Sequence, residues 1–167
     1  MAISIYNHFM TATPGPVPIH PDGLVVAGAY FPIEVHVPTV IADTLAQAGR
    51  PIPAPQIGLA IIDTGATLTA IHEPALTTLG LTPVNTVNMG TANGPTVQNV
   101  YAARVHFPTA GWNLELQMVV GSNLSGQVIP IQPPQPLICL IGRNTLRDWV
   151  LVWNGPGGFW TVAVSGQ

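Results

Sequence analysis

The sequence contains few charged residues. Asp, Glu, Lys and Arg make up 7% of its 167 residues, whereas a soluble domain usually carries about 25%. With four Lys and Arg residues in total, the chain cannot form the basic stripe that follows a phosphate backbone, which argues against a nucleic-acid partner. The formal net charge is -3. A surface so poor in charge is apolar or neutral and polar, and such surface often marks an interface or a binding groove.

Cysteine is scarcer still. A single residue, Cys139, excludes an intrachain disulfide, and its place in the apolar run 136–141 predicts burial in the core. We therefore expect a reducing, cytoplasmic location. Residues 1–8 have neither the basic nor the apolar region of a signal peptide. The most apolar segment, 24–42, is interrupted by Glu, His and Pro and falls short of the roughly 20 apolar residues that cross a membrane, so we expect no membrane partner.

Recognisable ligand sets for metals are also missing from the sequence. The five histidines show no His-x-x-x-His spacing, which argues against a metal site. No Gly-x-Ser-x-Gly motif is present, and Cys139 lacks the polar neighbours of a nucleophile. We therefore expect neither a metal nor a cofactor.

Long helical patterns are absent too. The 18 prolines and 17 glycines interrupt the chain at short intervals, which favours short strands joined by turns. Alternating apolar residues and short apolar runs predict strands at 31–37, 59–62, 101–107, 112–118 and 137–141, with a hairpin over 150–164. Capping and stop residues predict short helices at 39–49, 73–80 and 144–149.

The length fits one domain, and an apolar fraction of 47% supports a sizeable core. We interpret residues 24–167 as this domain and residues 1–23, which have little periodicity, as an N-terminal arm. The segment 122–136 is equally irregular and is interpreted as a loop. No internal repeat is visible, and the tripeptide Asp-Thr-Gly occurs once.

The most informative stretch is Ala-Ile-Ile-Asp-Thr-Gly-Ala-Thr at 60–67. An apolar run delivers Asp63 into a turn that Gly65 bends. Alone, Asp-Thr-Gly is a weak signal, because an aspartate often merely caps a turn. A second signature, Leu-Ile-Gly-Arg-Asn, follows at 140–144. There an apolar strand ends at Gly142 and a helix is predicted to begin, which alone would be an ordinary helix start.

In this order and at this distance, the two signatures resemble those of the retropepsin family, the single-domain, homodimeric aspartic proteases of retroviruses and their cellular relatives. The resemblance covers roughly residues 24–164, with extra sequence at 39–56 and 122–136. It implies an all-β fold of the acid-protease type, a closed barrel with a flap hairpin and one or two short helices. It also implies an aspartic endopeptidase that hydrolyses a polypeptide substrate.

The same resemblance implies a homodimer. The chemistry needs two carboxylates facing one water molecule, and this chain offers one suitable aspartate, Asp63. The second carboxylate must then come from another copy of the chain, in a contact related by a two-fold axis. Thr64 matches the position whose hydroxyl links the two loops across the dimer. Gly65 matches the glycine whose backbone approaches the substrate, and together with Asp63 and Thr64 it forms the candidate catalytic group.

The second signature implies structural support for that loop. Gly142 matches the glycine that packs tightly behind it, and Asn144 matches the residue that opens the C-terminal helix. Arg143 matches the arginine of the same signature. In viral members an aspartate four residues after the catalytic one pairs with this arginine. The position is Thr67 here, which leaves the partner of Arg143 open.

The flap is predicted at 87–97, where Asn93-Gly94 is a turn signal at the tip. A mobile lid of this kind would exclude water and hold an extended peptide, although the same dipeptide also fits an ordinary hairpin. Apolar side chains beside the loop and on the hairpin are candidate pocket walls. The candidate substrate-binding residues are Ala66, Leu68, Ile71, Met89 and Gly90.

The sequence leaves two alternatives open. The chain could be a catalytically silent module that keeps the fold and dimerises or binds peptides without turnover. It could also be a regulated form in which residues 1–23 lie in the cleft or join the dimer sheet. An enzyme would lose cleavage when Asp63 is replaced by Asn, while a binding module would behave the same with or without the carboxylate.

Overall fold

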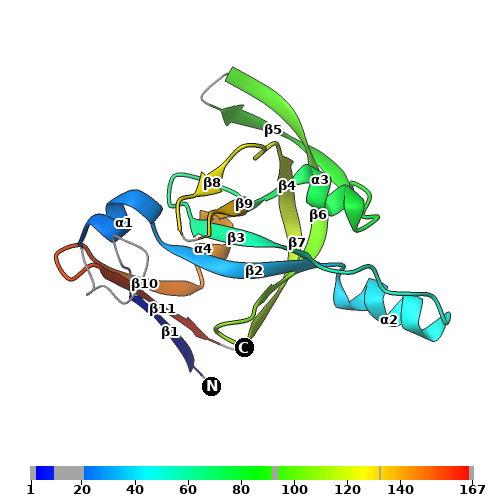
Figure 1. Ribbon diagram of the computed structural model, residues 1–167. Coiled ribbons are helices and arrows are strands. Elements are labelled where there is room, and N and C mark those ends of the chain that lie inside the picture. Colours follow the sequence, from blue (N-terminus) through cyan, green and yellow to red (C-terminus); the bar gives the residue numbers. More distant parts are fainter. Residues whose placement is uncertain (1–2, 10–20, 92–93, 132, 166–167) are drawn as a thin grey trace.

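The computed structural model describes residues 3–9, 21–91, 94–131 and 133–165 (Figure 1). Strands dominate, and the helices have four to nine residues. The elements in chain order are β1 (Ile3–Phe9), α1 (Pro21–Ala27), β2 (Tyr30–His36), α2 (Thr39–Gln47), β3 (Gln56–Ile62), β4 (Ala70–His72), α3 (Glu73–Thr78), β5 (Asn85–Thr91), β6 (Gly94–Phe107), β7 (Trp112–Ser122), β8 (Val128–Ile129), β9 (Gln135–Ile141), α4 (Arg143–Leu146), β10 (Trp149–Asn154) and β11 (Phe159–Ser165).

Six of these strands close into a barrel. Their order is β2-β3-β9-β4-β7-β6, and β6 pairs again with β2 to complete the circle. The pairs β3–β9 and β4–β7 are parallel, and the other four pairs are antiparallel. β5 extends from the barrel by pairing with the first half of β6, and β8 pairs with β9. The all-β closed barrel predicted from the sequence is confirmed.

The core lies inside this barrel. Phe31, Ile33 and Val35 of β2 point inward and are fully buried, because successive side chains of a strand face opposite sides. Val105 and Phe107 of β6 fill the barrel in the same way. The alternation predicted for these two strands is therefore confirmed. The alternation predicted for β7 is confirmed from Trp112 to Gln117 and fails at Met118, which is 48% exposed.

A second sheet packs beside the barrel, with strand order β1-β11-β10. β10 and β11 form the predicted C-terminal hairpin, and β1, from the segment interpreted as an arm, pairs along the outer side of β11. Trp160 of β11 joins the sheet to the barrel. Its ring centroid lies 4.6 Å from that of Phe31 in an edge-on arrangement, which adds to the gain from burying both rings.

Glycine ends two of the predicted helices. Gly49 follows α2 with φ +65°, and Gly80 follows α3 with φ +74°. A residue with a side chain rarely adopts these angles, so each glycine stops its helix. α3 begins with Glu73 and has Pro74 in its first turn, where the missing amide of proline costs no hydrogen bond.

Four predictions need correction. α4 ends at Leu146 rather than at 149, because the chain enters β10 at Trp149. The described residues form four short helices, whereas the local patterns predicted three and the resemblance implied one or two, and α1 was not anticipated. The segment 122–136 is not all loop, since Val128 and Ile129 pair with β9.

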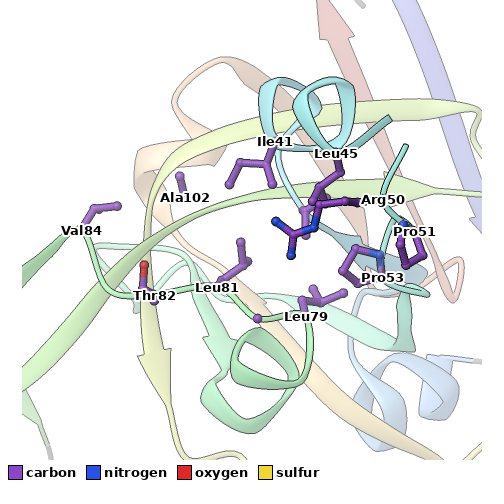
Figure 2. A pocket seen from close by; sticks show the side chains of 12 residues that line it. Ile41, Leu45, Arg50, Pro51, Pro53, Leu79, Leu81, Thr82, Val84 and Ala102 are labelled. Carbon is purple, nitrogen blue, oxygen red and sulfur yellow. The ribbon is translucent and has the colours of Figure 1, made fainter. Parts of the chain in front are cut away.

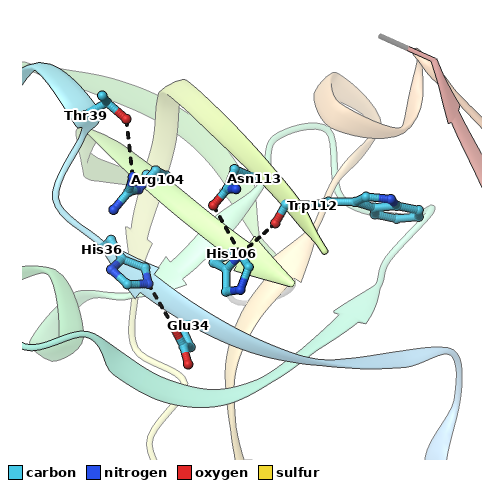
Figure 3. A network of polar contacts seen from close by, with 7 residues as sticks. All are labelled: Glu34, His36, Thr39, Arg104, His106, Trp112 and Asn113. Atoms are coloured by element: carbon cyan, nitrogen blue, oxygen red, sulfur yellow. Dashed lines mark hydrogen bonds and ion pairs between the residues drawn. The ribbon is translucent and has the colours of Figure 1, made fainter. Parts of the chain in front are cut away.

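The seam that closes the barrel carries polar side chains on its outer face (Figure 3). Glu34 accepts a 3.0 Å contact from His36 on β2. On β6, His106 contacts the carbonyl of Trp112 at 3.0 Å. Arg104 donates to the Thr39 hydroxyl at 3.4 Å. These contacts cover the pairing of β2 with β6 on its solvent side.

Cys139 lies in the core, as predicted, and burial raises the pKa of its thiol to about 12. Among the described residues, no group of three or more His, Cys, Asp and Glu side chains is arranged to hold a metal ion. The helices in the same part of the chain are all too short or too polar to cross a bilayer.

Candidate active site

The two sequence signatures meet because β3 and β9 are parallel neighbours. Ile62 pairs with Ile141 at the carboxyl ends of the two strands. Asp63 follows the last residue of β3 and Gly142 follows the last residue of β9, so both leave the sheet at the same edge. The Asp63 amide donates to the Ile141 carbonyl at 3.0 Å, which fixes the start of the loop to the neighbouring strand.

The Asp63 carboxylate is held by its own loop. Its Oδ1 atom accepts hydrogen bonds from the amides of Gly65 at 2.9 Å and Ala66 at 3.1 Å. The Ala66 amide also lies 3.2 Å from the Asp63 carbonyl. This tight turn leaves the side chain half-buried and Thr64 and Gly65 exposed. A Cβ atom on Gly65 would lie 3.1 Å from Oδ1, so a side chain there would press on the carboxylate.

Arg143 holds the same loop from the other side. Its Nη1 atom donates to the carbonyls of Thr64 at 2.8 Å and Gly65 at 3.0 Å. Its Nη2 atom donates to the Thr67 hydroxyl at 2.9 Å. The question left open by the sequence is thereby answered. Arg143 binds two backbone carbonyls and a hydroxyl, and the planar guanidinium suits several acceptors at fixed positions.

The first turn of α4 adds backbone contacts to this loop. The Arg143 amide donates to the Ala66 carbonyl at 2.9 Å, and the Asn144 amide donates to the Thr67 carbonyl at 3.1 Å. Amides at the start of a helix have no partner within the helix. Here the loop carbonyls supply that partner, so the helix and the loop satisfy each other.

Gly142 is required by close packing. A Cβ atom at this position would lie 2.4 Å from the carbonyl carbon of Leu68 and 2.7 Å from the amide of Thr69. Both are backbone atoms, so no side-chain rotation would relieve the clash. The packing role that the resemblance implies for Gly142 agrees with this geometry.

Two buried threonines complete the support, and the sequence analysis did not single them out. Thr69 is 1% exposed and Thr145 is 8% exposed. Asn144 Oδ1 accepts from the amide of Thr69 at 2.7 Å and from its hydroxyl at 3.0 Å. That hydroxyl also contacts the Thr145 hydroxyl at 2.7 Å and accepts from the Gly142 amide at 3.1 Å. A hydroxyl residue between Leu68 and Ala70, in an otherwise apolar stretch, was the available signal.

The predicted flap is a hairpin of β5 and β6 that projects from the barrel (Figure 1). Met89 pairs with Thr96, and Gly90 pairs with Pro95. Gly94 has φ +106° beside the turn, an angle that favours glycine. The other residue of the predicted tip, Asn93, lies outside the described residues.

The root of this hairpin is tied to α3. Glu73 Oε1 accepts hydrogen bonds from the Tyr101 hydroxyl at 2.6 Å and from Asn99 Nδ2 at 2.7 Å. The Tyr101 bond and the Asn99 bond lower the pKa of Glu73. The pKa of Tyr101 is raised to about 12, mainly by burial of its hydroxyl and secondly by the hydrogen bond to Glu73. Gly121 leaves room for the pair, since a Cβ there would lie 2.8 Å from the Tyr101 ring.

A sequence model described as aspartyl protease matches residues 56–145, a range that contains the Asp63 loop, the hairpin and the first turn of α4. The chain belongs to the aspartyl protease family. The resemblance predicted from the two signatures is confirmed at this level. A comparison with curated proteins finds no match.

Two solved structures are similar to this chain. One is the simian foamy virus (mac) protease, with 19% identity, 70% of this chain and 91% of that chain covered, and a TM-score of 0.40. The other is a retropepsin-like aspartic protease from Rickettsia conorii, with 12% identity, 98% and 95% coverage, and a TM-score of 0.46.

The residues expected to contact the substrate differ in their exposure. Ala66, Leu68 and Met89 are half-buried and Gly90 is exposed. Ile71 is 0% exposed and belongs to the core, so its side chain is not available as a pocket wall in this arrangement. Two cavities lined by described residues lie elsewhere, and Asp63 lines neither of them.

Proposed function

We propose that this protein is an aspartic endopeptidase that hydrolyses peptide bonds as a homodimer. The observation that carries the proposal is the Asp63 carboxylate at the end of β3, fixed through Oδ1 by the Gly65 and Ala66 amides. Membership of the aspartyl protease family supports this assignment. The proposed substrate is a polypeptide bound in extended form.

The proposed chemistry needs a second carboxylate. Asp63 is the only aspartate in the loop, and the groups that hold the loop are neutral or cationic. A two-fold dimer would place Asp63 opposite Asp63 of a second copy. Two carboxylates this close would share one proton, because both cannot carry a negative charge at short distance, as in aspartic proteases in general.

The pair would then act as base and acid. The ionised Asp63 removes a proton from the water molecule between the carboxylates while the water oxygen bonds to the scissile carbonyl carbon. The protonated mate donates a hydrogen bond to the carbonyl oxygen. When the tetrahedral carbon expels the amine, the nitrogen takes up a proton from the pair, and the products are an acid and an amine. No covalent bond to the protein forms.

Rigid support of the loop would serve this reaction. The Arg143 bonds to Thr64 and Gly65 carbonyls and the tight fit of Gly142 hold the carboxylate at one position. A catalytic group held in place before the substrate arrives loses little freedom during the reaction, which lowers the barrier. The β5–β6 hairpin is the proposed lid, and Met89 and Gly90 on β5 are the proposed substrate contacts.

The test is mass-spectrometric detection of cuts in a mixed peptide library at several pH values. Wild type and Asp63→Asn are compared at concentrations that populate a dimer, with the dimer measured by sedimentation. We expect cuts by the wild type that are absent from the variant. An intact dimer that makes no cuts would reject the proposal in favour of the silent binding module.

A further inference from the structure

A cavity of about 350 Å³ lies beside α2 (Figure 2). Its walls come from α2, from the proline-rich connector 50–53 and from the segment 79–84 that leads into β5. The lining is mainly aliphatic and includes Val37, Ile41, Leu45, Leu79 and Leu81. Ligand pockets in proteins span roughly 300–1,000 Å³ and are lined mostly by apolar side chains, so this cavity suits a small ligand.

One charged group belongs to this lining. The guanidinium of Arg50 points into the space between α2 and the segment that carries Leu79 and Leu81 (Figure 2). The other three arginines each have a side-chain contact, Arg104 with Thr39, Arg143 with the catalytic loop and Arg147 with Asp148. Within the described residues, the Arg50 side chain has no hydrogen bond or ion pair.

The cavity is separate from the catalytic loop. The connector enters β3 at Gln56, and Asp63 follows the far end of that strand. Seven strand residues at about 3.3 Å each place the two sites about 20 Å apart along β3. A ligand in the cavity would therefore leave the Asp63 loop free.

We propose that this cavity binds a small aliphatic carboxylic acid in its ionised form. The carboxylate pairs with the Arg50 guanidinium, whose two parallel donors match the two oxygens. The aliphatic chain lies against Ile41, Leu45 and Leu81, where burial of apolar surface favours binding. An amine of the same length would face like charge, and an alcohol would lack the ion pair.

The cavity also borders the segment that leads into the β5–β6 hairpin. Residues Leu79–Val84 form one wall of the cavity, and β5 begins at Asn85. The opposite wall comes from α2, and its lining residue Ile41 is 39% exposed to solvent. An acid bound between the two walls would cover part of this apolar surface.

The experiment is a titration of the isotopically labelled full chain with octanoate, octanol and octylamine, followed by amide chemical shifts. We expect octanoate to shift the amides of 40–53 and 79–84 and to bind at least tenfold more tightly than the other two. Equal affinities for octanoate and octylamine, or shifts elsewhere in the protein, would overturn the proposal. Tighter binding of N-acetylated dileucine than of octanoate would overturn the choice of a free acid over a peptide carboxyl end.

Matched variants separate charge from shape. Arg50→Gln should weaken octanoate at least tenfold and leave octanol unchanged, while Ile41→Gln, at a partly exposed helix position, should weaken both. Arg147→Gln, which removes an exposed guanidinium outside the cavity, should change neither. An Arg50→Gln protein with native amide shifts and undiminished octanoate affinity would contradict the assignment of Arg50.

Discussion

The Tyr101 hydroxyl on β6 donates a 2.6 Å hydrogen bond to the carboxylate of Glu73 at the start of α3. The bond ties the root of the β5–β6 hairpin to α3. The pKa of Glu73 is lowered by this bond and by the bond from Asn99. The ionised carboxylate therefore stabilises the folded state at pH values above its ordinary pKa of 4.5. That contribution is lost as the pH falls through the lower pKa of the folded state.

We predict that Glu73→Gln removes this pH dependence. At neutral pH the variant should be less stable than wild type by about 1–3 kcal/mol, the cost of losing hydrogen bonds to a charged acceptor. The difference should shrink as the pH falls below 4.5. Urea unfolding at several pH values measures it, with the exposed Asp148→Asn as a control. A difference that stays constant with pH would show that ionisation of Glu73 contributes nothing.

The Arg143 side chain gives a second prediction. Arg143→Lys keeps the charge, but one ammonium group cannot reproduce the bonds to the Thr64 and Gly65 carbonyls and the Thr67 hydroxyl together. We expect peptidase activity to fall about 100-fold, because a small displacement of a catalytic group lowers the reaction rate by about this factor. Arg147→Lys, at the exposed position just after α4, is the matched control. An unchanged kcat in Arg143→Lys would show that the loop holds its shape without the guanidinium hydrogen bonds.

Gly142→Ala tests the close packing behind the loop. The added methyl group would lie 2.4 Å from a backbone carbon of Leu68, and relief requires movement of the loop itself. We expect a loss of at least about 3 kcal/mol in the free energy of unfolding. Gly90→Ala is the control, since nothing lies within 4 Å of its added methyl group. Equal melting temperatures for the two variants would contradict the packing argument.

Thr69→Val tests the buried hydroxyl network. The change preserves shape and removes the oxygen that accepts from the Gly142 amide and contacts Asn144 and Thr145. Leaving buried partners unsatisfied should cost about 1–3 kcal/mol. Thr69→Ser keeps the hydroxyl and should lose less. Thermal unfolding of the two variants measures the difference. A Thr69→Val protein as stable as wild type would show that the hydroxyl network does not stabilise the fold.

The Asp63 loop and the glycine and helix start behind it were predictable because their signals are local. An apolar run followed by Asp63 and Gly65 specifies a strand and a turn, and an apolar run followed by Gly142 specifies a strand and a helix start. The parallel pairing of β3 with β9 brings the two together. The buried positions of β2 were predictable from the alternation of apolar residues alone, because the two faces of that strand differ from each other in polarity.

Other features depend on tertiary contacts that no local pattern encodes. The hydroxyl of Thr69 forms hydrogen bonds with Asn144 and Thr145, which lie 75 and 76 residues away in the sequence. Ile71 was assigned to a pocket from its distance to Asp63 along the chain, but its side chain faces the barrel interior. β8 has two residues and is specified by its partner β9 rather than by its own periodicity.

In the proposed enzyme, one active site uses Asp63 from two copies of the chain. The most direct test mixes wild type with Asp63→Asn at constant total concentration and lets the subunits exchange. If both carboxylates are needed, an equal mixture should retain about half of the activity per wild-type chain, since random pairing gives half of the wild-type chains a silent partner. Activity per wild-type chain that stays constant across all mixing ratios would contradict the shared site.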